Sequence, residues 1–453
     1  MTKIFADKDF NKKMLSLTLP MAFQQLMLAA VAAADAIMLG RLDQNSMAAV
    51  SLATQVQFVM NMFLASMTGA GSILGAQYWG KQDRKSVDDI FGIMLRIVAV
   101  IDIVFFVFCV FYPQLLMAFF TNDPTLASIG MKYLRIAGWS YLLVGFSQCY
   151  QAVMKFSGHA TSSAVISTSA VIINIVLNLI LIFGLAGVPQ MGAEGAATAT
   201  LISRITEIAA CIIISFKSDY VRPVLRRIFH RNRQLSRDFL VICYPLLGAS
   251  LLWGIGFTSY TAIMGHLGQD AAAANSVTAV VRDLCCCMCN GVANATSVIL
   301  GYELGTGDIE TARDYGEKIK ALSFLIGFIT MAVVLVLIPP VLKFYKLNPT
   351  ARSYLTGMLV ITAFYMIGRC INTVIINGIF AGGGDTKFDM YSNVVMMWCY
   401  GIPLALLAAF VFKLPVMVVY AFTCLDEVSK IPWVFAHYRK YRWLNNLTKD
   451  FSE

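Results

Sequence analysis

The chain has 453 residues, of which 58% are hydrophobic and 13% charged, and its mean hydropathy is +0.69. These values lie far from those of soluble domains and exclude a soluble globular or disordered protein. The net charge of +9 does not indicate a nucleic-acid partner, because the positions of Lys and Arg follow a membrane pattern.

Apolar segments recur along the whole chain. A hydrocarbon core of roughly 30 Å requires about 20 apolar residues as a helix. We predict twelve spans, over residues 14–40, 47–78, 91–113, 128–155, 162–184, 193–216, 239–264, 271–302, 317–340, 352–380, 388–412 and 415–436. Each half holds six spans, an even number, so both halves enter the membrane from the same side.

The two halves of the sequence resemble each other at a shift of about 225 residues. Pro20 falls on Pro245, Gly80 on Gly305 and Asp83 on Asp308. Duplicated halves are typical of transporters, whose substrate path lies between two repeats. The predicted fold is an all-α integral membrane protein, with twelve transmembrane helices as two parallel six-helix repeats around a central cleft.

The distribution of Lys and Arg predicts the orientation of the chain in the membrane. If both termini are cytoplasmic, the inner segments with the adjoining span ends hold 23 Lys and Arg residues, and the outer loops with the adjoining span ends hold five. Such an excess marks the cytoplasmic side. We therefore expect a multi-pass protein of the cell (plasma) membrane with both termini cytoplasmic.

One polar, basic stretch divides the chain where the repeat places its junction. We predict an N-terminal six-helix lobe over 1–216 and a cytoplasmic basic linker over 217–238. A C-terminal six-helix lobe over 239–436 and a cytoplasmic tail over 437–453 follow.

Ionisable residues inside a span are costly and usually functional or paired. Asp35 lies in the outer half of the first span, and the outer half of the fifth carries Asn174 and Asn178, four residues apart on one helix face. Thr198 and Thr200 start the sixth span at a similar level. A carboxylate, two amides and hydroxyls suit a hard monovalent cation or a hydrogen-bonded proton, although a structural polar cluster is the alternative.

The second half lacks this set and carries other charges. Asp283 and Arg282 lie in the eighth span and Arg369 lies in the tenth, where an ion pair is expected and a substrate-facing role is the alternative. Asp102 in the third span has no obvious partner in the sequence and is a second candidate for the coupling acid.

Other motifs favour neither an enzyme nor a metal site. Cys285, Cys286, Cys287 and Cys289 are nearly consecutive on a predicted helix, where neighbours point about 100° apart and do not converge on one ion. No catalytic nucleophile motif is evident and no His falls in the interior of a span. We expect no enzyme activity, no cofactor and no bound metal other than a possible Na⁺ at Asp35.

The chain resembles the multidrug and toxic compound extrusion (MATE) family over nearly its whole length. The segments that carry the resemblance are Pro20 with Asp35–Leu42, Ala48–Ser51, Gly75–Gly80, Asn174–Asn178, Gly192–Thr200, Gly378–Thr386 and Tyr441–Thr448. Two departures stand out. Many members have Asp at the position of Asn178, and many carry acids at positions that correspond to Trp253 and Cys370 of this chain.

The resemblance implies a cation-coupled antiporter that exports organic, often cationic, compounds such as drugs or toxins by alternating access, with H⁺ or Na⁺ as the coupling ion. Asp35 matches the family's first-helix acid. The expected partners are a small organic substrate and the lipid bilayer, with no nucleic acid, and the protein is expected to be a monomer. The alternative function is a lipid-linked oligosaccharide or polysaccharide flippase of the same superfamily.

Overall fold

The structure, a computed structural model, describes residues 7–185, 187–217, 219–221, 223–224, 228, 230, 232–345 and 347–450. Several residues of the predicted linker 217–238 and the end of the predicted tail therefore lie outside the described residues. Within the described ranges every regular element is a helix.

The first six predicted spans are all helical. They form α2 (Lys8–Leu42), α3 (Gln44–Gly80), α4 (Arg84–Phe111), α6 (Pro124–Phe156), α7 (Ala160–Phe183) and α8 (Gly192–Ser215), with a short α5 (Pro113–Phe120) between the third and fourth.

The other six spans are helical as well, but the last three are interrupted. The seventh to ninth form α10 (Arg233–His266), α11 (Gln269–Thr306) and α12 (Ile309–Phe344). The tenth is α13 (Pro349–Asn372) with the π-helical η1 (Thr373–Phe380); the eleventh is α14 (Lys387–Asn393), η2 (Val394–Gly401), α15 (Ile402–Leu406) and η3 (Leu407–Val411); the twelfth is α16 (Val416–Thr423) and α17 (Leu425–Tyr438). The predicted all-α, twelve-span, two-repeat fold is confirmed.

Ten helices in the described part of the chain are long and apolar enough to cross a membrane by length and composition. The exceptions among the twelve spans are α6 and the α16–α17 pair. Polar residues such as Gln148 and Gln151 lower the hydropathy of α6. Helices α16, with 8 residues, and α17, with 14 residues, are each too short to span alone, and α17 also carries Asp426, Glu427 and Lys430. These polar side chains are buried or half-buried inside the protein, which is where a spanning helix tolerates them.

Helix caps repeat at the same shift as the sequence. The Asp83 side chain accepts from the Ser86 N–H at the start of α4, and that of Asp308, 225 residues later, accepts from the Thr311 N–H at the start of α12. Asp123 and Asn348, also 225 apart, cap α6 and α13. Such caps satisfy the first free N–H groups of a helix, so the duplication preserves helix starts as well as apolar spans.

The chain divides into two compact units. Unit 1 comprises Met1–Ala22, Gly80–Gln82 and Tyr244–Glu453, and unit 2 comprises Phe23–Trp79 and Asp83–Cys243. Both α2 and α10 contribute to both units, and each has a proline beside the point of division, Pro20 and Pro245. A proline removes one backbone hydrogen bond from a helix, so each helix is weakened where it passes from one unit to the other.

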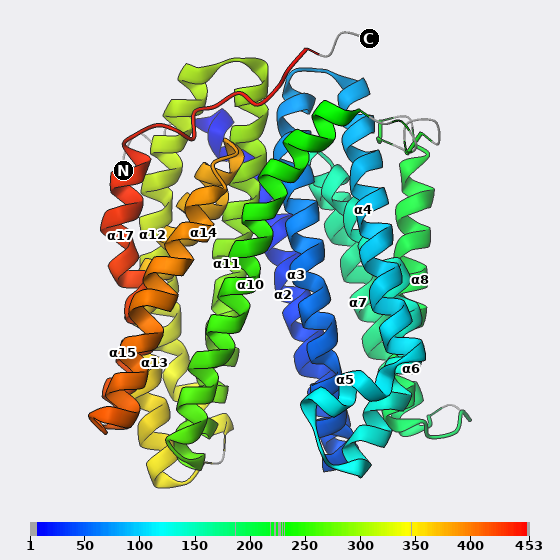
Figure 1. Ribbon diagram of the computed structural model, residues 1–453, viewed down its shortest axis with the longest axis vertical. Coiled ribbons are helices and arrows are strands. Elements are labelled where there is room, and N and C mark those ends of the chain that lie inside the picture. Colours follow the sequence, from blue (N-terminus) through cyan, green and yellow to red (C-terminus); the bar gives the residue numbers. More distant parts are fainter. Residues whose placement is uncertain are drawn as a thin grey trace. The chain divides into compact units, whose positions relative to one another are not determined.

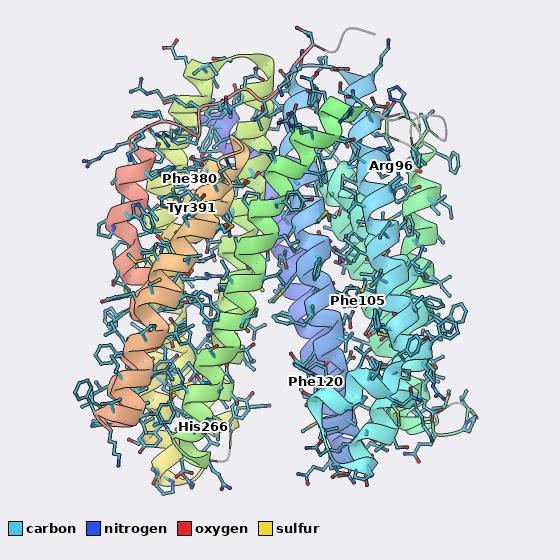
Figure 2. All side chains as sticks on the ribbon, viewed as in Figure 1. Arg96, Phe105, Phe120, His266, Phe380 and Tyr391 are labelled. Carbon is cyan, nitrogen blue, oxygen red and sulfur yellow. The ribbon has the colours of Figure 1, made fainter. Side chains whose placement is uncertain are left out.

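Within unit 2, α4 and α8 both pack on α6, and α7 packs on α8 (Figure 1). Within unit 1, α13 packs on α11, α12 and α17. Side chains fill the space between these helices, including Phe105 of α4, whose ring meets that of Phe63 in α3 at a centroid distance of 6.2 Å (Figure 2).

Candidate cation site in the first half of the chain

The C-terminal halves of α2 and α7 are joined by a short hydrogen bond. The Asn178 amide donates to Asp35 Oδ1 at 2.5 Å and also lies 3.1 Å from Asn174 Oδ1. Asn174 and Asn178 are four residues apart on α7, so both face the same side of that helix. Asn178 is fully buried and Asn174 is 5% exposed.

Helix α8 completes the group with hydroxyls. The Asn174 amide lies 3.4 Å from Thr200 Oγ1 and 3.5 Å from Ser203 Oγ. Both hydroxyls donate to carbonyls of their own helix, which leaves their oxygen lone pairs for other donors. Asp35, Asn174, Asn178, Thr200 and Ser203 therefore form one connected cluster from three helices.

Thr198 is not joined to this cluster by any hydrogen bond between described residues. It stands two positions, or about 200° of helix rotation, from Thr200, and its hydroxyl donates to the Glu194 carbonyl at 2.8 Å. Sequence reasoning did not include Ser203. Its place three residues after Thr200, on the same helix face, could have indicated it.

The cluster has the chemistry of a small-cation site. Asn178 Oδ1 is buried without a hydrogen-bond partner among the described residues, and the second oxygen of Asp35 has no described partner in the cluster. A monovalent cation such as Na⁺ is bound by oxygen ligands of this type, and a proton on Asp35 would reduce the charge. The residues present therefore fit either ion.

The charged residues Asp283, Arg282 and Arg369 of the second half do not form one common site. Arg282 pairs with its neighbour Asp283 at 2.9 Å, and its guanidinium lies 4.3 Å from the centre of the Phe257 ring. Arg369 pairs with Glu427 at 2.6 Å. Asp283 and Arg369 thus have separate partners, and no local sequence signal links Arg369 to Glu427, which lies 58 residues further along the chain.

Glu427 lies at the centre of a buried polar network in unit 1. The Asn372 amide donates to Glu427 Oε2 at 2.7 Å, and Lys430 Nζ is 3.9 Å from the same oxygen and 3.0 Å from Asn393 Oδ1. Glu427 and Lys430 are each 3% exposed. Buried charges of opposite sign with hydrogen-bonded neighbours are the arrangement that a low-dielectric interior tolerates.

The thiols of the cysteine cluster contact carbonyl groups of their own helix. The Cys287 and Cys289 thiols lie against the carbonyls of Asp283 and Cys286, and every Cys is free. No group of three or more His, Cys, Asp and Glu that could hold a metal occurs among the described residues.

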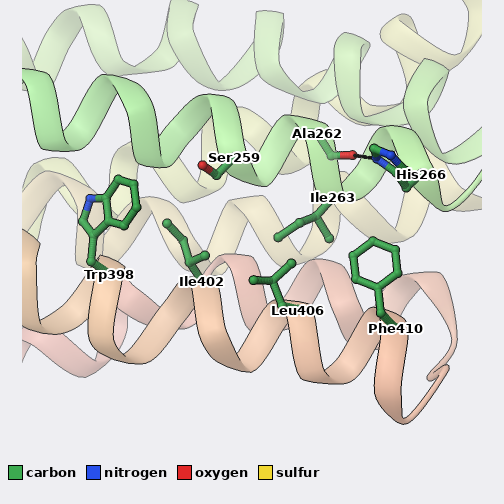
Figure 3. A pocket seen from close by; sticks show the side chains of 8 residues that line it. All are labelled: Ser259, Ala262, Ile263, His266, Trp398, Ile402, Leu406 and Phe410. Carbon is green, nitrogen blue, oxygen red and sulfur yellow. Dashed lines mark hydrogen bonds between the residues drawn. The ribbon is translucent and has the colours of Figure 1, made fainter.

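An apolar pocket of about 500 Å³ lies between α10 and the η2–α15–η3 segment of unit 1 (Figure 3). Its lining consists of Ser259, Ala262, Ile263, His266, Trp398, Ile402, Leu406 and Phe410. The Ser259 hydroxyl donates to the Ile255 carbonyl, and His266 Nδ1 lies 2.8 Å from the Ala262 carbonyl oxygen. Its two polar side chains are thus engaged with their own helix, and the pocket offers no carboxylate for a cation.

A model of the MatE family matches the chain twice, over residues 20–180 and 245–407. The two matches begin 225 residues apart, at Pro20 and Pro245, which is the shift of the internal repeat.

Curated relatives match over most of their own length. The chain is 25% identical to the uncharacterized transporter YisQ of Bacillus subtilis, covering 89% of this chain and 88% of that protein. It is 27% identical to the multidrug resistance protein NorM of Burkholderia vietnamiensis, covering 87% and 86%.

Solved structures show the same fold. A MOP superfamily transporter from Pyrococcus furiosus superposes with a TM-score of 0.87 at 18% identity, covering 96% of both chains. The Vibrio cholerae MATE transporter VcmN does so with a TM-score of 0.86 at 16% identity, covering 97% of this chain and 98% of that one.

Proposed function

Because this chain belongs to the MatE family, we propose that it is a cation-coupled antiporter that exports organic, often cationic, compounds by alternating access. Members of the family are transporters and not enzymes, and several relatives are named multidrug resistance proteins. Its place is the plasma membrane, with both termini in the cytoplasm and a small organic molecule as substrate. It works as a monomer built of two six-helix lobes.

The observation that supports this proposal is the connected cluster around Asp35. One carboxylate from α2 is held by an amide from α7 that is itself linked to the hydroxyls of α8. Binding of H⁺ or Na⁺ to Asp35 removes a negative charge from this cluster, and Asn174, Asn178 and Thr200 supply the remaining oxygens. Thr198 has a secondary role, because no hydrogen bond between described residues joins its hydroxyl to the cluster, whereas the Asn174 amide reaches Thr200.

The energy of one ion is sufficient for export. A single charge that moves through ~150 mV supplies about 3.5 kcal/mol, from roughly 2.3 kcal/mol per 100 mV. That supports a gradient of about 300-fold for a neutral substrate, because about 1.4 kcal/mol corresponds to a factor of ten. Loss of the ion restores the negative charge on Asp35. In this proposal α2 packs against α7 differently in the ion-bound and the ion-free states.

Asp35→Asn tests the role of the carboxyl. We expect efflux of a dye such as ethidium from intact cells to fall to the level of cells without the protein. An amide carries no negative charge and does not take up and release a proton as a carboxyl does. Asp43→Asn is the matched control: Asp43 lies just beyond α2 and accepts from the Ser46 N–H at 2.7 Å, a bond that an Asn side chain preserves. Wild-type efflux by Asp35→Asn would refute the coupling role.

The coupling ion is tested separately. Purified protein in vesicles receives either a pH gradient or a Na⁺ gradient, and substrate movement is followed. We expect one of the two gradients to drive wild-type transport and neither to drive Asp35→Asn. Transport by the variant under either gradient would show that coupling does not depend on Asp35.

A further inference from the structure

Helix α2 has a second polar contact within unit 2, three helical turns before Asp35. The Gln24 side-chain amide donates to Gln151 Oε1 of α6 at 2.6 Å. Gln24 and Asp35 are 11 residues apart, so they lie within about 20° of each other around α2 and about 16 Å apart along it. Unit 2 takes up α2 at Phe23, so Gln24 is near the start of the part of α2 that belongs to this unit.

The orientation of the Gln151 amide is fixed by a buried charge. The Gln151 amide nitrogen donates to Glu207 Oε1 of α8 at 2.7 Å, and Arg204 Nη1 donates to Glu207 Oε2 at 2.6 Å. The ion pair with Arg204 makes Glu207 a carboxylate, which only accepts hydrogen bonds. Gln151 must therefore turn its nitrogen to Glu207 and its oxygen to Gln24.

These contacts are shielded from the surroundings of the protein. Gln24 and Gln151 are each 5% exposed and Glu207 is 2% exposed. A hydrogen bond in such a place is costly to break, because the separated amide groups find no other partner. Among the described side chains of residues 23–38, Gln24 alone is buried. This part of α2 therefore has no buried apolar side chain among those described, and the polar contacts of Gln24 and Asp35 hold it to the unit.

Helix α8 carries both of these attachments. Ser203, which belongs to the Asp35 cluster, precedes Glu207 by four residues, so the two side chains share one face of α8. Asp35 reaches Ser203 through the two amides of α7. Gln24 reaches Glu207 through the Gln151 amide. Two chains of hydrogen bonds thus connect one face of α2 with one face of α8 at two levels.

Asp102, the second acid considered for coupling, takes no part in either chain. It has no exposed surface, and its carboxyl oxygens have no hydrogen-bond partner among the described residues. The charge that orients the second chain is therefore that of Glu207.

We propose that Gln24, Gln151 and Glu207 are positioning residues, which hold α2 in the register where Asp35 meets Asn178. Without the Gln24 contact, the outer part of α2 is free to move away from α7, and the ion-binding cluster is assembled for a smaller fraction of the time. The affinity for the coupling ion falls by that fraction. This inference rests on the proposed function and adds to it the residues that set the ion affinity.

The melting temperature of the purified protein tests this proposal without transport. An ion that binds the folded state raises the melting temperature, so the midpoint of that rise with H⁺ or Na⁺ concentration reports the affinity. We expect Gln24→Leu to move the midpoint to an about fivefold higher ion concentration, the effect of one buried hydrogen bond. Gln25→Leu is the matched control, because Gln25 is half-buried and points about 100° away around the helix. The Gln25→Leu midpoint should equal that of the wild type, and equal midpoints for the two variants would overturn the proposal.

A double-mutant cycle tests the contact itself. Gln151→Leu should shift the midpoint at least as far as Gln24→Leu, since it also removes a donor from Glu207. The variant with both substitutions should shift the midpoint by less than the product of the two single shifts, because both remove the same hydrogen bond. Shifts that multiply would show that the two side chains act independently, and the proposal would be wrong.

Transport in vesicles separates positioning from general damage to the fold. We expect Gln24→Leu to raise the ion concentration for half-maximal transport about fivefold and to keep the rate at saturating ion within about twofold of wild type. High ion concentration restores the assembled cluster, so the rate recovers there. A lower saturating rate with an unchanged half-maximal concentration would show that Gln24 only stabilises the fold.

The two proposals fail in different ways. If Asp35→Asn keeps the ion-dependent rise in melting temperature, the coupling role of Asp35 is wrong and this inference falls with it. If Asp35→Asn loses that rise while Gln24→Leu keeps the wild-type midpoint, the proposed function stands and this inference alone is wrong.

Discussion

At the scale of single residues, the Asp35 cluster depends on the side-chain amide of Asn178, which contacts two other members of the cluster. Asn178 donates to Asp35 and lies against Asn174, so it links the acid to the rest of the site. The family resemblance indicates that many members have a second acid at this position. In this chain the link is neutral, and the negative charge of the site rests on Asp35.

Replacement of Asn178 by Ala should disable this link. We expect substrate efflux to fall by about tenfold or more, because loss of a buried hydrogen bond to a charged group costs about 1.5–3 kcal/mol. Efflux from cells and the melting temperature of the purified protein are the measurements. Thr198→Ala is the matched control in the same bundle and should stay near wild type, since no hydrogen bond between described residues joins the Thr198 hydroxyl to the cluster. Equal losses in the two variants would contradict this account.

His159, just before α7 and outside the predicted spans, provides a pH-dependent contact. Its ring lies 3.9 Å from that of Tyr220, whose hydroxyl is 2.6 Å from Ser162 Oγ. Burial lowers the pKa of His159 below its ordinary value of 6.5, against an opposing effect from Asp219. The folded state therefore favours the neutral ring.

The sign of the pH effect follows from this. The contact stabilises the protein fully above about pH 6.5, and its contribution is lost as the pH falls through the lowered folded pKa. We expect the difference in melting temperature between wild type and His159→Gln to shrink between about pH 7 and pH 5. A difference that stays constant over this range would exclude the contact as its source.

At the scale of elements, the tail that follows α17 is held against the turn between η1 and α14. Trp443 has no exposed surface, and its ring stacks on Tyr438 at 5.4 Å. A Cβ atom on Gly383 would lie 1.6 Å from the Trp443 carbonyl oxygen. Only glycine allows the two backbones to approach this closely, which gives a structural reason for the glycine run in this turn.

Gly383→Ala should therefore displace the tail. We expect a loss of about 1–3 kcal/mol in stability, the usual effect of an added methyl group at a close contact, and faster tryptic cleavage at Arg442. Melting temperature and the rate of cleavage are measured together. Gly265→Ala in α10, where an added Cβ meets nothing within 4 Å, serves as the control. If cleavage at Arg442 is as slow in Gly383→Ala as in Gly265→Ala, the tail is not held by this contact.

At the scale of the whole molecule, the distribution of Lys and Arg predicts the orientation. The predicted inner segments with the adjoining span ends hold 23 of these residues, and the predicted outer loops with the adjoining span ends hold five. Reporter fusions test this expectation. We expect alkaline phosphatase, which is active only outside the cytoplasm, to be inactive when fused after residue 216 and active when fused after Lys413. Green fluorescent protein should give the opposite result, and a reversed pattern would contradict the predicted topology.

Much of this architecture is encoded locally and could be predicted from the sequence. A bilayer requires each spanning segment to satisfy its own backbone, so apolar runs of sufficient length become helices whatever their neighbours are. The same holds for the repeat, which is visible in Pro20 and Pro245 and recurs in the caps Asp83 and Asp308. Interruptions of the last spans, such as the break at Cys424, were not predicted because an apolar run looks the same with or without them.

The partners of the buried polar groups depended on the tertiary structure. Sequence spacing placed Asn174 and Asn178 on one helix face, but it did not distinguish Thr200 from Thr198 or reveal Ser203, because helix rotation decides which hydroxyl faces a neighbour. Contacts between distant segments, such as Arg369 with Glu427 and Asp102 with Gly145, have no local signal. The sequence alone therefore determined which segments span the membrane and where costly charges lie, while only the packing of helices decided which charges are paired and which are left without a partner.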